Sequence, residues 1–142
     1  MGSFDSDSTV HRVGYMFVAF SHLTDGDVDD KEMTTLAGIL WAYLEVWKVD
    51  LTGDGVVDID DVCKLIDDDI VPFYNTQDVD SRIDYFVATA VALKNQDWWT
   101  NDFADMLLEQ LKKVAMADGN YHEGEKVWIE ALSDAFGVGV PA

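Results

Sequence analysis

Cysteine and basic residues are scarce in this chain of 142 residues, and each scarcity excludes a class of protein. The single cysteine, Cys63, cannot form an internal disulfide, so the fold does not depend on an oxidising compartment. Cys63 lies in an apolar stretch, and we expect it to be a core side chain rather than a reactive thiol. Nine Lys and Arg residues stand against 28 Asp and Glu, which gives a formal net charge of −19. That charge repels phosphate backbones and anionic lipid, so we expect no nucleic-acid partner.

Long apolar runs are also missing. No stretch approaches the roughly 20 apolar residues that cross a bilayer, so we expect no direct membrane insertion. The segment 1–9 is polar and acidic and has no hydrophobic stretch, which favours a cytoplasmic protein. We find no nucleophile with a paired base and no glycine loop that would cradle a phosphate, so we name no catalytic residue and expect a non-enzymatic protein.

Apolar residues are abundant and recur at helical spacing. Hydrophobic residues make up 49% of the chain, which suffices for a buried core and excludes a wholly disordered acidic chain. The spacing predicts helices over 10–25, 29–47, a short segment from about 62 that ends before Pro72, 78–95, 101–117 and 123–136. In the fourth of these we expect a core-facing set comprising Ile83, Phe86, Val87, Ala90 and Val91. The chain is predicted to be an all-α, single-domain helical bundle over 10–138, with a flexible N-terminus at 1–9 and a C-terminal tail at 139–142.

Two Asp-Gly turns indicate an internal repeat. The segment 19–32, around Asp25-Gly26, aligns with the segment 112–125, around Asp118-Gly119. Each copy has an apolar helix before the turn and acidic residues after it. Glycine permits the positive φ that ends one helix, and carboxylates in the next first turn offset its dipole. We therefore predict two repeated helix-turn-helix units.

The second copy carries a family resemblance. Its core is the segment Ala115-Met116-Ala117-Asp118-Gly119-Asn120-Tyr121-His122-Glu123-Gly124-Glu125-Lys126, which is followed by Ala135-Phe136-Gly137-Val138. These two segments resemble the signature of the TerB-like (tellurite-resistance protein B) family. The first copy resembles the N-terminal half of that family's duplicated fold, and the resemblance covers about 10–47 and 100–138. It implies a helical bundle, a cytoplasmic stress-response or tellurite-resistance role and acidic residues suspected of binding metal. It implies no established catalytic activity.

The strongest chemical motif is the acidic loop 50–61. Calcium prefers six to eight hard oxygen ligands, which a twelve-residue loop supplies from its first, third, fifth, seventh, ninth and twelfth positions. Glycine at the sixth position, here Gly55, allows the sharp turn, and the apolar eighth residue, Val57, is expected to be buried. The loop therefore resembles an EF-hand loop, and more closely the dockerin variety. Its predicted ligands are Asp50, Thr52, Asp54, the carbonyl of Val56, Asp58 (through water) and Asp61.

Two ligands depart from the usual pattern of such loops. Thr52 brings a hydroxyl without charge, and Asp61 is one methylene shorter than the usual glutamate, so the following helix has to approach more closely. The alternative interpretation is an Asp-rich turn that caps the next helix. Four carboxylates in one loop repel one another without a cation, which favours bound Ca²⁺, with Mg²⁺ as the alternative ion.

The two Asp-Gly turns are not complete EF-hand loops, because Leu23 and Met116 fall at ligand positions. Their acidic residues could still converge on a second ion if the repeats pack together, or they are solvated helix caps; the residues in question are Asp25, Asp29, Glu32, Asp118 and Glu125.

The remaining polar and aromatic features have ordinary interpretations. We expect surface or capping histidines at 22 and 122, core or helix-packing tryptophans at 41, 47, 98 and 99 rather than a sugar platform, and a solvated helix end at 67–69.

Three functions follow from these observations. The first is a calcium-binding TerB-like domain that acts in a stress-linked metal response or in calcium-dependent binding of another protein. The second is a dockerin-like interaction module in which calcium is a permanent structural staple. The third is a metal-dependent hydrolase that uses the acidic turns.

Overall fold

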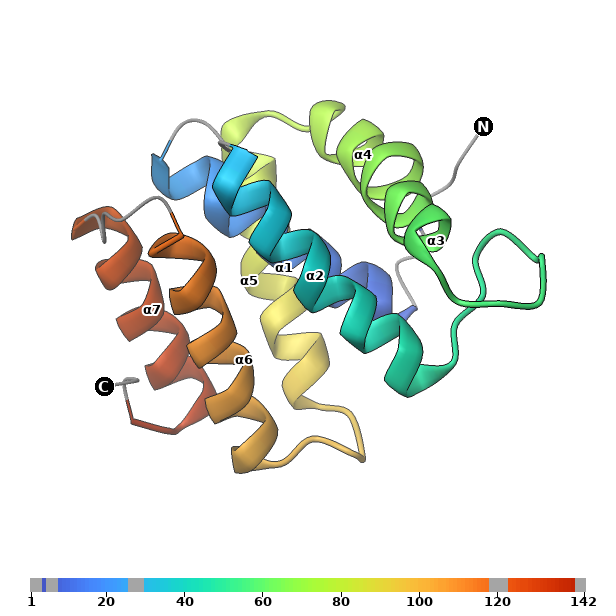
Figure 1. Cartoon of the computed structure of the whole chain (residues 1–142). Coiled ribbons are helices and arrows are strands. Elements are labelled where there is room, and N and C mark those ends of the chain that lie inside the picture. Colours follow the sequence, from blue (N-terminus) through green and yellow to red (C-terminus); the bar gives the residue numbers. More distant parts are fainter. Residues whose placement is uncertain (1–3, 5–7, 26–29, 118–122, 140–142) are drawn as a thin grey trace.

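The computed structural model describes residues 4, 8–25, 30–117 and 123–139. Within those ranges the protein is helical and has no strand, which confirms the predicted all-α class. Figure 1 shows the helices in chain order, which are α1 (Thr9–Asp25), α2 (Asp30–Trp47), α3 (Ile59–Cys63), the π-helix η1 (Lys64–Ile70), α4 (Val71–Asn75), α5 (Val79–Lys94), α6 (Asn101–Ala115) and α7 (Glu123–Phe136).

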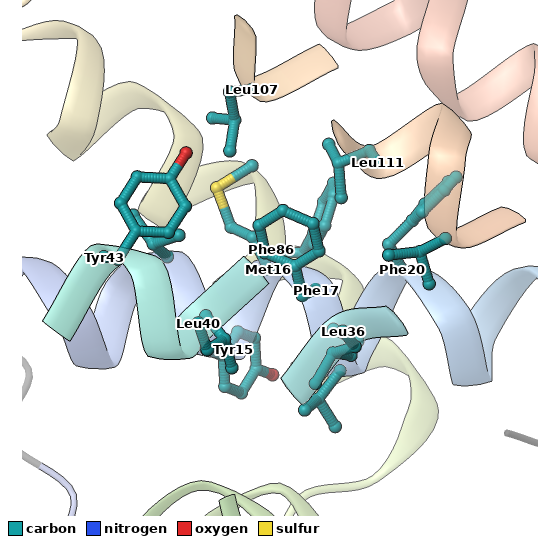
Figure 2. Packing of buried hydrophobic residues seen from close by; sticks show 14 of the residues in the cluster. Tyr15, Met16, Phe17, Phe20, Leu36, Leu40, Tyr43, Phe86, Leu107 and Leu111 are labelled. Carbon is teal, nitrogen blue, oxygen red and sulfur yellow. The ribbon is translucent and has the colours of Figure 1, made fainter. Parts of the chain in front are cut away.

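Helix α1 lies at the centre of the fold. It contacts α2, η1, α4, α5, α6 and α7, and its buried side chains point in every direction around the helix. A helix that is apolar all round has to be covered on all sides, in contrast to an amphipathic surface helix. In Figure 2, residues from three helices surround Met16, Phe17 and Phe20 of α1; they are Leu36, Leu40 and Tyr43 of α2, Phe86 of α5, and Leu107 and Leu111 of α6.

Local capping residues explain why several helix boundaries agree with the prediction. Helix α5 begins after Asp78, whose carboxylate accepts the Ser81 N–H at 2.7 Å. Helix α6 begins after Thr100, whose hydroxyl accepts the Phe103 N–H at 3.1 Å. Helix α7 ends before Gly137, which has a φ of 72°. Side-chain oxygens at helix starts and glycine after helix ends supply partners for backbone groups that the helix leaves unpaired.

The predicted end of the third helix before Pro72 is wrong. Helical structure continues from Ile59 through η1 and α4 to Asn75. In η1 the hydrogen bonds span five residues, and the Val71 N–H still donates to the Ile66 carbonyl. Pro72 then occupies one of the first two positions of α4, where a missing N–H is tolerated. The wider π turn therefore lets the chain pass the proline without leaving helical geometry.

Three expected core side chains are exposed instead. Helix α5 turns Phe86 and Ala90 towards the core, whereas Val87 is 54% exposed and Val91 is 50% exposed. Successive residues in an α-helix differ by about 100° in direction, so one apolar stripe can be covered while its neighbour remains open. Cys63 is likewise exposed, because the preceding Val62 takes the core-facing position. The expectation that all of these side chains lie in the core was therefore wrong.

The predicted solvated end at 67–69 holds for Asp67 and Asp68 but is wrong for Asp69, which is only 2% exposed. One carboxylate oxygen of Asp69 lies 2.8 Å from His11 Nε2, and the other lies 2.9 Å from Lys64 Nζ. Lys64 and Asp69 are five residues apart, the hydrogen-bond spacing of a π-helix. This geometry turns Asp69 towards α1, where its charge is paired rather than solvated.

Helix α1 approaches η1 closely at Gly14. A Cβ atom built on Gly14 would collide with Ile70 Cδ1, so this contact requires the absence of a side chain. A Cβ atom built on Gly38 of α2 would meet no other atom within 4 Å, so Gly38 serves as a natural comparison.

We expect Gly14→Ala to lower the melting temperature and Gly38→Ala to raise it. Alanine is favoured over glycine by up to about 1 kcal/mol within a helix. At position 14 the displacement of Ile70 outweighs that gain, because overpacking costs about 1–3 kcal/mol. Ile70→Val removes Cδ1, so the Gly14→Ala, Ile70→Val double variant should be more stable than the sum of the single effects indicates. Thermal melts of the four variants measure this coupling, and strictly additive effects would contradict the close approach.

The Asp78 cap should make stability depend on acid pH. Hydrogen bonds from the Ser81 N–H and hydroxyl hold the pKa of Asp78 below its ordinary value. The stabilisation is therefore present above about pH 4, the unfolded pKa, and is lost as the pH falls through the lower folded pKa. Asn also caps a helix but does not titrate. The difference in melting temperature between wild type and Asp78→Asn should shrink from pH 6 to pH 2.5, and a constant difference would show that the carboxylate charge is irrelevant.

Candidate metal centre

The acidic loop lies between α2 and α3 and projects from one side of the helical assembly (Figure 1). Helix α2 ends at Trp47, and Lys48 then adopts a left-handed conformation with a φ of 54°. Gly53 and Gly55 also have positive φ, at 77° and 90°. The turn predicted at Gly55 is therefore present, and glycine is the residue that adopts it without strain.

Asp61 closes the loop. Its side chain is fully buried, and its carboxylate accepts three backbone N–H groups. Oδ1 accepts from Leu51 at 2.8 Å and from Thr52 at 3.0 Å, and Oδ2 accepts from Asp58 at 2.9 Å. The last residue of the loop is thereby tied to its beginning and to the start of α3.

The other carboxylates also order the loop backbone. Asp50 accepts the Gly53 N–H at 2.9 Å through Oδ1 and the Gly55 N–H at 2.7 Å through Oδ2, and the Thr52 hydroxyl lies 3.3 Å from Oδ1. Asp54 Oδ1 accepts the Val56 N–H at 3.1 Å. Because the carboxylates are fixed by backbone donors, the loop is folded around its acidic groups.

Three of the predicted ligands come together. Oxygens of Asp50, Asp54 and Asp61, one from each, all lie within 4.8 Å of one another. Calcium–oxygen distances are about 2.3–2.6 Å, so two ligands on opposite sides of one ion are about 5 Å apart. The spacing of the three carboxylates therefore fits a single calcium ion between them.

The remaining predicted ligands are placed less directly. Asp58 is not part of the three-carboxylate group, and its Oδ1 accepts the Asp60 N–H at 3.1 Å. The Thr52 hydroxyl lies beside Asp50. The Val56 side chain is a hydrocarbon, so that residue would contribute only its carbonyl. The donor set of carboxylates, hydroxyl and carbonyl consists of hard oxygens, the chemistry that Ca²⁺ and Mg²⁺ prefer.

The loop carries unbalanced negative charge. Partial burial raises the pKa of Asp58 and outweighs the Asp60 N–H, and the nearby carboxylates of Asp54, Asp60 and Asp61 raise it further. Burial alone would also raise the pKa of Asp61, but the N–H donors of Asp58, Thr52 and Leu51 hold it below its ordinary value. Asp61 is thus held as an anion while its neighbours repel one another, an environment in which a cation is favourable.

The second predicted ion site lies mostly outside the described residues. Asp29 and Asp118 are not among them, nor are the side chains of Asp25 and Glu32. Glu125 is described, and it is buried on α7. The second ion and the internal repeat therefore stay predictions.

The histidines and tryptophans can be compared with their predicted roles. His22 Nδ1 lies 2.8 Å from the Tyr74 hydroxyl, which makes it a packing and hydrogen-bonding residue, and His122 lies outside the described residues. Trp41, Trp47 and Trp99 are partly buried against the core, as expected, whereas Trp98 is 40% exposed. His11 has no predicted role, because nothing local in the sequence connects it with Asp69, which lies 58 residues away.

Comparisons with known proteins give no family. No protein-family model, curated protein or solved structure matches the chain. The resemblance to the TerB-like family therefore stays a prediction. No helix in the described part of the chain is both long enough and apolar enough to cross a membrane.

Asp61 should be required for loop structure even without metal. In excess chelator, Asp61→Ala leaves three backbone N–H groups without their acceptor, and unsatisfied buried groups cost about 1–3 kcal/mol. Asp60→Ala is the matched control, because Asp60 is an adjacent, exposed aspartate. Urea unfolding should show the loss for Asp61→Ala only. Equal stability of the two variants would contradict the role of Asp61 in closing the loop.

Proposed function

We propose that the loop 50–61 binds one calcium ion and that the protein is a non-enzymatic, calcium-binding helical domain. The observation that supports this most is the convergence of the Asp50, Asp54 and Asp61 carboxylates within 4.8 Å. These three residues are the first, fifth and twelfth of the loop, the positions from which an EF-hand-like loop contributes side-chain ligands. In this proposal the ion is also contacted by Thr52, the Val56 carbonyl and, through water, Asp58.

The proposed ion would fix the angle between α2 and α3. A bound calcium ion supplies positive charge that offsets the repulsion among the loop carboxylates. Asp61 accepts N–H groups from Leu51 and Thr52 at the start of the loop, and it also lies in the first turn of α3. A shift of Asp61 towards an ion would therefore move both the start of the loop and the start of α3. The ion in this way sets the surface that α2 and α3 present to another protein.

A structural staple is the second candidate, and it has its own support. The loop backbone is already ordered by hydrogen bonds to Asp50, Asp54 and Asp61. An ion there could be permanent and have no regulatory role, as in a dockerin-like interaction module. Thermal melts in calcium, magnesium and chelator separate the two functions. A fold that survives in chelator supports a sensor, and a fold that collapses supports a staple.

The cellular role belongs to the same proposal. The TerB-like resemblance suggests a tellurite-resistance or stress-linked metal response in the cytoplasm, and the all-helical fold is compatible with it. The measured affinity for calcium would test the cytoplasmic location. A dissociation constant of about 0.1–10 μM is typical of intracellular sensors and would support it, whereas about 0.1–1 mM is typical of extracellular modules and would count against it.

Asp54→Ala should abolish calcium binding at the loop without unfolding the protein. Asp54 is exposed, and its carboxylate accepts the N–H of Val56 within the loop. With one neutral ligand, the wild type should bind with a dissociation constant of about 10 μM to 1 mM. Free calcium at a hundred times that dissociation constant should then stabilise the fold by about 2.7 kcal/mol. Asp60→Ala, at the non-liganding eleventh position, is the control. Isothermal titration calorimetry measures both, and unchanged binding in Asp54→Ala would show that the loop assignment is wrong.

A further inference from the structure

An apolar groove lies between α5 and α7, outside the acidic loop. Both helices pack on α1, and they contact each other less extensively than they contact α1. The space between them is a groove of about 380 Å³ whose lining is almost entirely hydrophobic. Phe86 and Trp128 meet at its base, with ring centroids 4.8 Å apart and an interplanar angle of 77°.

The walls of the groove are exposed apolar side chains. Val87 and Val91 line it from α5, one helical turn apart, and Val127 and Ala131 line it from α7 in the same way. The three valines are at least 50% exposed. Two parallel rows at a spacing of four residues form a trough that accepts one apolar helix face, with anchors at i, i+3 or i+4, and i+7.

The rim of the groove is acidic. On α5, Asp84 and Asp80 precede Val87 by three and seven residues, and on α7, Glu130 and Asp134 follow Val127 by three and seven residues. Residues at these spacings share a helix face, so each exposed carboxylate borders the apolar lining.

The nearby lysines already have contacts. Lys94 Nζ donates to the Ala135 carbonyl at 2.9 Å, across one end of the groove. Lys126 Nζ lies 3.8 Å from a Glu123 carboxylate oxygen. A hydrogen bond to a neutral carbonyl leaves the charge of Lys94 in place, but the four carboxylates of the rim outnumber the two lysines, so the rim keeps a net negative charge.

This charge pattern selects the occupant. A second copy would bring two acidic rims together in a protein with a net charge of −19, and an anionic membrane would be repelled in the same way. A helix with an apolar face flanked by Lys or Arg would satisfy both the lining and the rim. We propose that the groove binds a basic amphipathic helix of another protein, independently of the acidic loop.

The test uses a synthetic peptide as the probe. A Leu/Lys amphipathic peptide of about 18 residues, five helical turns, is titrated into the full chain in about 150 mM salt. A matched peptide carries Glu in place of Lys. Calorimetry should show saturable one-to-one binding of the Lys peptide, no binding of the Glu peptide, and unchanged binding in Asp54→Ala, which separates this site from the proposed calcium loop.

Two valine variants separate groove binding from general electrostatic attraction. Val127→Asp places a charge in the groove lining, and Val79→Asp places the same charge on the exposed start of α5, outside the lining. Both add negative charge, so non-specific attraction of a cationic peptide would tighten in both. If the peptide occupies the groove, Val127→Asp should weaken binding at least about tenfold and Val79→Asp should leave it within about twofold. Melting curves verify that both variants fold.

Several outcomes would overturn the proposal. These are equal binding by the two variants, equal binding of the Lys and Glu peptides, or no saturable binding of the Lys peptide. Sedimentation velocity adds a further one, because a wild-type dimer that Val127→Asp dissociates would assign the groove to a second copy of the chain.

Discussion

The burial of α1 on all sides is the constraint on which the rest of the structure depends. All residues from Val13 to Ser21 are buried, so α2, η1, α5, α6 and α7 are placed by the need to cover this stretch of α1. Burial of apolar surface contributes about 25 cal/mol per Å², so the buried side chains of α1 contribute to stability together with those of every helix that α1 contacts. The acidic loop follows from that arrangement. It joins α2, which packs against α1, to α3, which leads directly into η1, and η1 also packs against α1.

Features with a local cause were predictable from the sequence, and features that depend on distant partners were not. The Asp78 cap and the loop spacing involve residues only a few positions apart. This is why α5 begins where the sequence predicts and why Asp50, Asp54 and Asp61 lie close together, while their role as metal ligands stays a prediction. A helical apolar stripe, in contrast, does not reveal whether another helix covers it, so Val87 was misplaced in the core. Nor does it reveal a π turn, which moves Asp69 from solvent to a buried ion pair.

The large negative charge serves different structural purposes at different sites. Asp61 is a buried acceptor that ties a loop together, and Asp69 is a buried partner of His11 and Lys64. Asp78 caps a helix at the surface. The carboxylates of the α5–α7 rim are exposed and border apolar surface. A carboxylate with a structural partner contributes to the fold, whereas an exposed one beside an apolar groove contributes to the choice of what binds there.

The π-helical segment Lys64–Ile70 makes the length of this part of the chain critical. A π turn amounts to one residue inserted into an α-helix, and removing it would rotate everything downstream by about 100°. Such a deletion would turn Asp69 away from His11 and Ile70 away from Gly14 at the same time. Substitutions in η1 alter single contacts, but a change in residue number alters all of them. The segment should accordingly tolerate sequence variation far better than insertion or deletion.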